Sequence, residues 1–264
     1  MSDARFSDLQ ARALSALVMV VVGAVALWLG GVTFSLLAVA LAGAMGWELY
    51  RMMVPEAPFG RAEAHGVVAA VLVAVFTLVW LGPTSILALA AGAGLLALRM
   101  PRDKWIFGLY LLLILTAVHG LILLREIYGL AFVLWLVCVV IASDVAGYFA
   151  GRLIGGPKFW PRVSPKKTWS GTVAGWICAA LVGAGFAYAT GMPWAIVPLS
   201  ALLALAGQLG DIAESAIKRR TGVKDSSNLI PGHGGVLDRF DAMIAVAALA
   251  LLLVHLGLFA RLAA

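Results

Sequence analysis

Long apolar runs recur along almost the whole of this chain, and they constrain its fold more than any other feature. We count nine such stretches: 13–29, 32–50, 66–82, 83–98, 105–124, 127–149, 172–190, 193–210 and 242–260. A helix that crosses the hydrocarbon core of a bilayer needs about 20 apolar residues, with about 17 as a lower limit. The pattern predicts an all-α fold, a polytopic transmembrane helical bundle of about nine spans.

The composition supports the same class. Charged residues make up 12% of the 264 residues and hydrophobic residues 63%, whereas a soluble domain carries about 25% charged residues. So little polar surface excludes a soluble enzyme, a disordered chain and a secreted disulfide scaffold. We expect one integral membrane domain, 1–264, with N-terminal spans in 1–125 and the motif-bearing half in 126–264. The net charge of +6 does not indicate a nucleic-acid partner, because in a membrane protein the distribution of charge matters more than its sum.

The basic residues predict the orientation of the bundle, because Lys and Arg accumulate in cytoplasmic segments of membrane proteins. With nine spans and a cytoplasmic N-terminus, 17 of the 19 basic residues fall inside, and only Arg125 and Arg261 fall outside. The outside connections are then Gly30-Gly31, Leu81–Thr84, Arg125-Glu126 and Thr190–Pro193. This split predicts a multi-pass protein with a cytoplasmic N-terminus. We expect it in the inner (plasma) membrane, in contact with the lipid bilayer. Two long polar segments, 151–171 and 211–241, lie on the cytoplasmic side, which is where we expect the active site.

Four acids stand at the ends of predicted spans near these polar segments. Asp144 lies late in the stretch 127–149, Asp211 follows 193–210, and Asp238 and Asp241 precede the last stretch. An Asp at mid-bilayer costs about 2.5–3.5 kcal/mol on insertion scales, so such acids are usually paired, bound to metal or solvated. Asp211, Asp238 and Asp241 can meet at one depth and form an oxygen-rich site suited to Mg²⁺. The alternative is that these acids terminate spans and pair with nearby Lys and Arg.

Groups that bind phosphate are dense around these acids. The run Ser164-Pro165-Lys166-Lys167-Thr168 gives two ammonium charges flanked by hydroxyls, and a helix start there would add backbone N–H donors. Ser215 and Lys218 share a helix face with Asp211. Lys218-Arg219-Arg220 and Lys224 add four cations, although the positive-inside rule and anionic lipids also favour basic loops.

A glycine-rich turn lies between these cations and the last acids. Pro231-Gly232-His233-Gly234-Gly235 is a backbone that can approach a ligand closely and form an anion-binding nest. Single loop histidines are usually ordinary surface residues. His233, however, stands between Lys224-Asp225 and the carboxylates of Asp238 and Asp241, which favours a role in chemistry.

One ordered run in the segment 211–241 has a specific resemblance. It reads Ser215-x-x-Lys218-Arg219-x4-Lys224-Asp225, followed by Pro231-Gly232-His233-Gly234-Gly235-x-x-Asp238-Arg239-x-Asp241. This run closely resembles the signature of the phosphatidate cytidylyltransferases, or CDP-diacylglycerol synthases. Ser143-Asp144, Gly151-Arg152 and the Ser164–Thr168 run also look like that family. The motifs cover roughly residues 140–245, and the N-terminal half resembles the family only in its hydrophobic pattern.

The resemblance implies a reaction in which CTP and phosphatidic acid give CDP-diacylglycerol and pyrophosphate, with Mg²⁺ and possible use of a second cation. The implied metal ligands are Asp211, Asp238 and Asp241, and the implied catalytic residues are these three with Lys167 and His233. The implied substrate-binding residues are Asp144, Ser164, Lys166, Lys167, Thr168, Ser215, Lys218, Arg219, Lys224, Asp225, Gly234, Gly235 and Arg239. The resemblance also suggests a homodimer.

Two departures and three competing interpretations accompany this prediction. Ser170 stands where the family usually has an acid, and Ser226-Ser227-Asn228 where it tends to have Phe-Gly. A secondary transporter of an anionic solute would also place acids near the membrane, but no polar motif repeats between the halves. An intramembrane aspartyl protease would need Gly-x-Gly-Asp, and Gln208-Leu209-Gly210-Asp211 lacks the first Gly. The Asp-Gly-x-x-Ala-Arg core of the CDP-alcohol phosphotransferases is absent.

Overall fold

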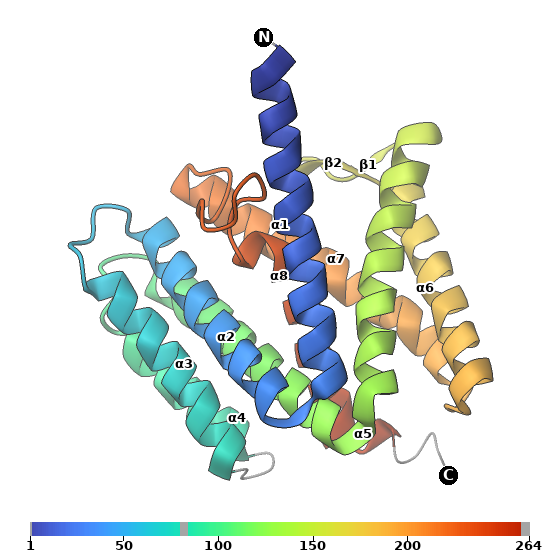
Figure 1. The fold of residues 1–264 in the computed structure, drawn as a ribbon, viewed down its shortest axis with the longest axis horizontal. Coiled ribbons are helices and arrows are strands. Elements are labelled where there is room, and N and C mark those ends of the chain that lie inside the picture. Colours follow the sequence, from blue (N-terminus) through green and yellow to red (C-terminus); the bar gives the residue numbers. More distant parts are fainter. Residues whose placement is uncertain (1, 80–83, 260–264) are drawn as a thin grey trace. The chain divides into compact units, whose positions relative to one another are not determined.

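The chain is described by a computed structural model that covers residues 2–79 and 84–259, with side chains from residue 12 onward. Within these described residues, eight helices and two short strands follow one another (Figure 1). The elements are α1 Ser2–Leu29, α2 Gly31–Met53, α3 Arg61–Val79, α4 Thr84–Ala97, α5 Lys104–Leu153, β1 Lys158–Trp160, β2 Ser164–Thr168, α6 Trp169–Thr190, α7 Ile196–Thr221 and α8 Leu237–His255.

The apolar runs of the sequence coincide with these helices. Within the described residues, six helices are long and apolar enough to cross a membrane: α1, α2, α3, α5, α6 and α7. The mostly helical, apolar chain fits the predicted all-α membrane protein. The count of about nine spans stays a prediction. Residues 81–83 of one predicted connection, and the ends of the predicted spans 66–82 and 242–260, lie outside the described residues.

Two predicted spans, 105–124 and 127–149, lie within the single 50-residue helix α5. Its helical dihedral angles are interrupted at Gly129, where φ is 80° and ψ is −172°. A positive φ of this kind is easy for glycine and strained for residues with a Cβ. The break between the two spans therefore lies at Gly129, and the predicted connection at Arg125-Glu126 is itself helical.

The chain divides into two compact units, and the first contains residues 1–122 and 220–240. In this unit α2 packs along α3, and α1 and α4 contact α2 and α3 respectively (Figure 1). Its core includes a stack of Tyr50 on His65, with ring centroids 4.0 Å apart, and the edge of Phe107 against both rings. The exposed Arg220 donates two hydrogen bonds to Asp103, which lower the pKa of that carboxyl below its usual value.

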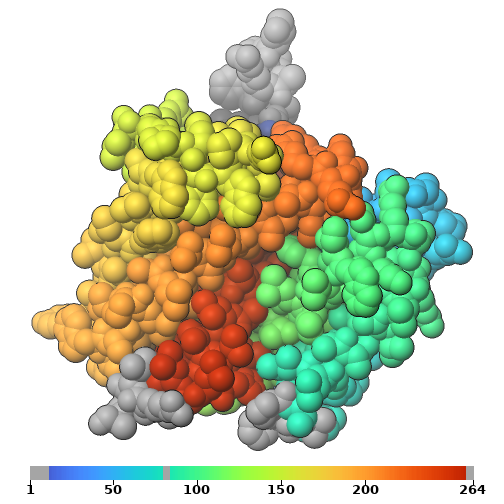
Figure 2. Space-filling model, turned by 180° about the vertical axis from the view of Figure 1, so that it is seen from behind, coloured from blue at the N-terminus to red at the C-terminus, as the bar shows by residue number. Residues whose placement is uncertain are grey.

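The second unit contains residues 123–219 and 241–264. Its core is built around Trp135, which is fully buried and donates to the Ser200 hydroxyl at 2.9 Å. The helices α6 and α7 are seen in yellow to orange in Figure 2. Their exposed apolar side chains include Ile177, Leu181 and Leu202. Such a surface is expected to face lipid. Residues 1–264 thus divide into two compact units. That these units form a single membrane domain stays a prediction.

The polar segment 151–171 contains a short β-hairpin that the all-α prediction did not include. β1 and β2 are antiparallel, and Lys158 pairs with Thr168 while Trp160 pairs with Ser164. Thr168 ends β2 and caps α6, since its hydroxyl accepts a hydrogen bond from Gly171 N at 3.2 Å. The Lys-Lys-Thr run is therefore a strand whose last residue caps the helix that starts directly after it.

We expect Gly171→Ala to lower the stability of the second unit by about 1–3 kcal/mol, the usual range for overpacking. A Cβ at Gly171 would lie 2.5 Å from the carbonyl oxygen of Gly147, so α6 and α5 would have to separate. Gly185→Ala in the same helix is the control, because no atom lies within 4 Å of its Cβ position. Thermal unfolding in detergent measures both variants, and equal unfolding temperatures would contradict the close contact of α5 and α6.

Candidate active site

A cavity of about 380 Å³ lies in the second unit, between the end of α5, the strand β2 and the facing parts of α6 and α7. Its walls contain three cations, two carboxylates and four side-chain hydroxyl groups of Ser, Thr and Tyr, which suits a polar, anionic ligand. The lining residues are Ser143, Asp144, Gly147, Tyr148, Gly151, Arg152, Lys166, Lys167, Thr168, Gly171, Thr172, Gln208 and Asp211.

The ammonium group of Lys167 is held in the cavity wall by an ion pair and a hydrogen bond. It lies 2.5 Å from Asp211 Oδ2 and donates to the carbonyl oxygen of Gln208 at 3.1 Å. Asp211 also accepts a hydrogen bond from Ser215 at 3.3 Å. Both charges are partly buried, with 23% of the Lys167 side chain and 34% of the Asp211 side chain exposed. The strand β2 and the helix α7 therefore present one cation and one carboxylate side by side in the cavity wall.

The end of α5 supplies a second group of polar side chains. Asp144, Tyr148 and Arg152 are spaced four residues apart on one helix face, and all three line the cavity. Arg152 donates to the Tyr148 hydroxyl at 2.7 Å. Asp144 and Lys167, predicted from the sequence as substrate-binding residues, are thus brought to one cavity with Lys166 and Thr168.

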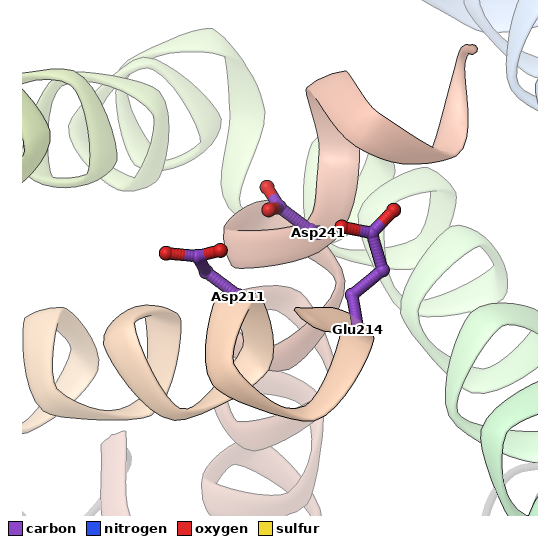
Figure 3. A group of neighbouring side chains, drawn as sticks. All are labelled: Asp211, Glu214 and Asp241. Atoms are coloured by element: carbon purple, nitrogen blue, oxygen red, sulfur yellow. The ribbon is translucent and has the colours of Figure 1, made fainter. Parts of the chain in front are cut away.

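Three carboxylates come together on α7 and α8 (Figure 3). One oxygen each from Asp211, Glu214 and Asp241 lies within 4.8 Å of the others, and Glu214 is fully buried. The helices approach closely because α7 has glycine where α8 passes. A Cβ at Gly210 would lie 2.6 Å from the carbonyl oxygen of Asp241. Two of the three predicted metal ligands, Asp211 and Asp241, are therefore neighbours, and Glu214 joins them.

The structure gives Asp238 different partners. Its carboxylate accepts hydrogen bonds from the backbone N–H groups of Ser226 and Gly235, at 2.9 and 2.7 Å, and from the Ser226 hydroxyl at 3.0 Å. Asp238 is not in the carboxylate group found among the described residues. It lies in the first turn of α8, and its contacts tie that turn to the loop before it.

The glycine-rich segment forms a tight turn in the first unit. Ile230 and Gly234 pair as an isolated β-bridge, and Gly232 and Gly234 have positive φ angles of 73° and 84°. The ring nitrogen Nδ1 of His233 lies 2.8 Å from the Ser15 hydroxyl of α1. Arg239 donates two hydrogen bonds to the carbonyl oxygen of His233, at 3.1 and 2.8 Å. The glycine-rich segment is thus a turn, and Arg239 is bonded to it through the carbonyl oxygen of His233. Its role as an anion-binding nest stays a prediction.

The other predicted residues are placed as follows. Lys218 forms an ion pair with Glu214 at 2.5 Å, one helical turn away. Ser164 begins β2 opposite Trp160. Arg219, Lys224 and Asp225 are exposed. A Cβ at Gly235 would lie 2.6 Å from Glu48 Oε1 and closer still to Ser226 Oγ, so only glycine fits there.

Three residues important to these sites were missed by the sequence analysis: Glu48, Gln208 and Glu214. Gln208 is buried in the cavity wall, where its amide accepts from Trp176 Nε1 and donates to Ser143. Glu214 lies three residues after Asp211, a helical spacing that could have revealed it. Glu48 falls inside the predicted span 32–50, and an ionisable residue inside a span is itself a sign of function.

Comparison with known proteins defines the family. A model of the Cytidylyltransferase family matches residues 10–257. Phosphatidate cytidylyltransferases from Brucella suis and Brucella melitensis are each 35% identical over 265 residues, covering 92% of this chain and 92% of each relative. The phosphatidate cytidylyltransferase of Staphylococcus haemolyticus is 41% identical over 121 residues, covering 45% of this chain and 46% of the relative.

The chain belongs to the cytidylyltransferase family. The relatives that match it over nearly their full length carry the name phosphatidate cytidylyltransferase. The family resemblance that the sequence motifs predicted is confirmed.

Proposed function

We propose that this protein transfers the cytidylyl group of CTP to phosphatidic acid. An oxygen of the phosphatidate phosphate attacks the α-phosphorus of CTP, and the bond from that phosphorus to the bridging oxygen of the β-phosphate breaks. The products are CDP-diacylglycerol and pyrophosphate, which carries away the bonding electrons. The nucleotidyltransferase relatives and the family match support this reaction.

The main structural support for this reaction is the cavity of the second unit. Arg152, Lys166 and Lys167 line it together with Asp144 and Asp211. Triphosphate and phosphatidate are both anions, so the main barrier to their reaction is electrostatic and orientational. Lys167 is partly buried, so it offsets that repulsion more strongly than a cation in bulk water, whereas Arg152 and Lys166 are exposed. We assign substrate phosphate binding to Lys166, Lys167, Thr168 and Arg152.

No strong general base is required in this reaction. The attacking group is a phosphate monoester, which is already anionic at neutral pH. The protein therefore acts by holding the two substrates and by compensating their charge. Lys167 is the best placed group for this task, because its ammonium lies 2.5 Å from Asp211 while its side chain still reaches the cavity surface.

The group Asp211, Glu214 and Asp241 suits Mg²⁺ in its chemistry. All three ligands are carboxylate oxygens, the donors that Mg²⁺ prefers, and two opposite ligands of an octahedral Mg²⁺ lie about 4.2 Å apart. Their oxygens lie within 4.8 Å of one another, so small side-chain rotations suffice. We propose that these residues hold the ion, which when bound would neutralise phosphate charge. For Asp238, predicted as a third ligand, we propose instead that it orders the loop before α8.

The remaining assignments rest on the sequence and the family. Ser164, Ser215, Lys218, Arg219, Lys224, Asp225, Gly234, Gly235 and Arg239 are proposed substrate-binding residues, and His233 is proposed to orient or protonate a phosphate oxygen. We propose an inner-membrane protein of about nine spans, with a cytoplasmic N-terminus, an active site at the cytoplasmic face and a homodimeric state. The 17-to-2 division of basic residues supports the orientation.

The proposed reaction is tested with purified chain in detergent, α-³²P-labelled CTP and phosphatidate, with Mg²⁺ or with a chelator. We expect a labelled liponucleotide and an equal amount of pyrophosphate, both dependent on Mg²⁺. Folded protein that forms neither product would contradict the proposal. Uptake of an anionic solute into proteoliposomes without any nucleotide would favour the transporter alternative.

The proposed orientation predicts that the two ends of the chain lie on opposite sides of the membrane. Reporter fusions at Met1 and Ala264, which lie outside the described residues, should place the N-terminus in the cytoplasm and the C-terminus outside. A fusion in the polar loop 222–236 should report a cytoplasmic location. If both termini report the same side, the number of spans is even, and the two short stretches 66–82 and 83–98 are the first candidates for merging.

A further inference from the structure

Glu48 is a carboxylate with no exposed surface, located on α2 in the first unit. Its Oε1 accepts hydrogen bonds from the Ser227 hydroxyl at 2.6 Å and from Val236 N at 2.9 Å. Its Oε2 accepts from Leu237 N at 2.7 Å. Among the described residues, every hydrogen bond that the structure gives this carboxylate comes from the segment 226–237, about 180 positions later in the chain.

These contacts join both ends of the signature loop, which we define as residues 224–237. Ser227 lies near the start of the loop, and Val236 and Leu237 lie at its end, where α8 begins. The two N–H groups belong to the helix start and would otherwise lack intrahelical partners. A negative charge at a helix N-terminus is also favoured by the helix dipole. The Glu48 side chain therefore accepts hydrogen bonds from the first N–H groups of α8 and also links the two ends of the loop.

Asp238 completes this arrangement from the other side of the loop. It accepts from Ser226 N and Gly235 N, and the Ser226 hydroxyl lies 3.0 Å from its Oδ2 and 3.4 Å from Glu48 Oε2. Gly235 lies between the two acids, too close to Ser226 and Glu48 for any Cβ. The two carboxylates thus hold the loop at four backbone N–H groups, those of Ser226, Gly235, Val236 and Leu237.

We propose that Glu48 is a positioning residue for the cytidylyl transfer. By fixing both ends of the signature loop, it holds Lys224, Asp225 and His233 in the conformation that binds substrate. The inference rests on the proposed function, and it assigns an active-site role to the N-terminal half of the chain. A carboxylate is required, because both oxygens of the side chain act as acceptors.

Glu48→Gln is the test, because it keeps the size of the side chain but turns one acceptor into a donor that faces N–H or O–H groups. We expect kcat/KM to fall about 100-fold, the loss that misplaced active-site groups can produce, while the protein elutes as wild type does. We also expect faster amide exchange in the peptide that contains Val236 and Leu237. Glu63→Gln is the matched control. Glu63 accepts from Trp47 and Gly60 in the same unit, and neither partner belongs to the loop, so this variant should retain activity.

Activity of Glu48→Gln within twofold of the Glu63→Gln control, with unchanged exchange, would overturn the proposal. If Glu48→Gln fails to accumulate, Ser227→Ala takes its place. It removes the 2.6 Å hydroxyl bond to Glu48 and the 3.0 Å bond that Leu229 N donates to the same hydroxyl, and it keeps the bonds of Glu48 to Val236 and Leu237. A loss of kcat/KM with faster exchange then supports the proposal, and wild-type values overturn it. Wild-type protein that makes no liponucleotide would contradict the proposed function alone, because the exchange comparison still reports on the loop.

Discussion

Asp241→Asn is expected to lower cytidylyl transfer more than about 100-fold, since losing even an outer-shell partner of a metal site typically costs 10- to 100-fold. The amide keeps the size of the side chain and one oxygen, but it removes the charge that favours a hard cation. Asp241 lies with Asp211 and Glu214 in the proposed magnesium site (Figure 3). We expect Asp241→Asn to need a higher Mg²⁺ concentration for its half-maximal rate, in addition to having a lower rate.

Two measurements separate loss of the metal from loss of the fold. Mg²⁺ that binds only the folded state raises the unfolding temperature, so it should stabilise wild type and not Asp241→Asn. Asp103→Asn is the matched control, because Asp103 pairs with Arg220 at the surface and is not in the carboxylate group. Its activity and its response to Mg²⁺ should be those of wild type. Substantial Mg²⁺-dependent turnover by Asp241→Asn would refute the metal assignment and leave the family assignment intact.

The helices of this chain could be predicted because a lipid environment makes hydropathy a direct signal of structure. Each described apolar run forms a helix, and the two runs that share α5 are separated by the positive φ of Gly129. The hairpin β1–β2 could not be predicted in the same way. Its residues Lys158–Trp160 and Ser164–Thr168 are mostly polar and half of them are exposed, so they lack the apolar alternation that usually identifies a strand.

The cavity was partly predictable from local spacing. Asp144, Tyr148 and Arg152 share a helix face, and the Lys-Lys-Thr run precedes the next helix, so their chemistry could be read without tertiary contacts. Gln208 could not be identified in this way, because its role depends on Trp176 and Ser143, which come from two other helices. Residues that support a site through contacts between elements leave no periodic signal.

The acidic residues also show which features local spacing predicts and which depend on tertiary contacts. Asp211 and Asp241 were expected to be neighbours, and their carboxylates are close in the structure. Asp238 was grouped with them because it lies three residues before Asp241 on one helix. The sequence did not reveal that the N–H groups of Ser226 and Gly235 would surround its carboxylate. The hydrogen bonds of Asp238 thus come from a loop of irregular backbone, whose contacts have no periodic pattern in the sequence.

Lys167→Ala is expected to lower kcat/KM for CTP by about 100-fold or more, the range seen when a charge-stabilising donor is removed from an active site. The Lys167 ammonium lies between Asp211 and the carbonyl oxygen of Gln208 in the cavity wall. A cation held in this way costs little reorganisation when phosphate charge develops beside it. Removing it also leaves Asp211 without its nearest counter-charge, which should repel the triphosphate.

The matched control is Lys104→Ala, which removes a basic residue whose ammonium lies over the Trp105 ring, 5.6 Å from its centroid, at the start of α5. A general attraction of basic residues to anionic lipid predicts similar, small effects for both variants. A phosphate-binding role predicts a selective loss in Lys167→Ala, together with partial recovery in Lys167→Arg, which restores the charge with a different geometry. Steady-state titrations of CTP at fixed phosphatidate and Mg²⁺ distinguish these results. If Lys167→Ala and Lys104→Ala behave alike, the cations of this cavity serve the membrane surface and the phosphate site lies elsewhere in the chain.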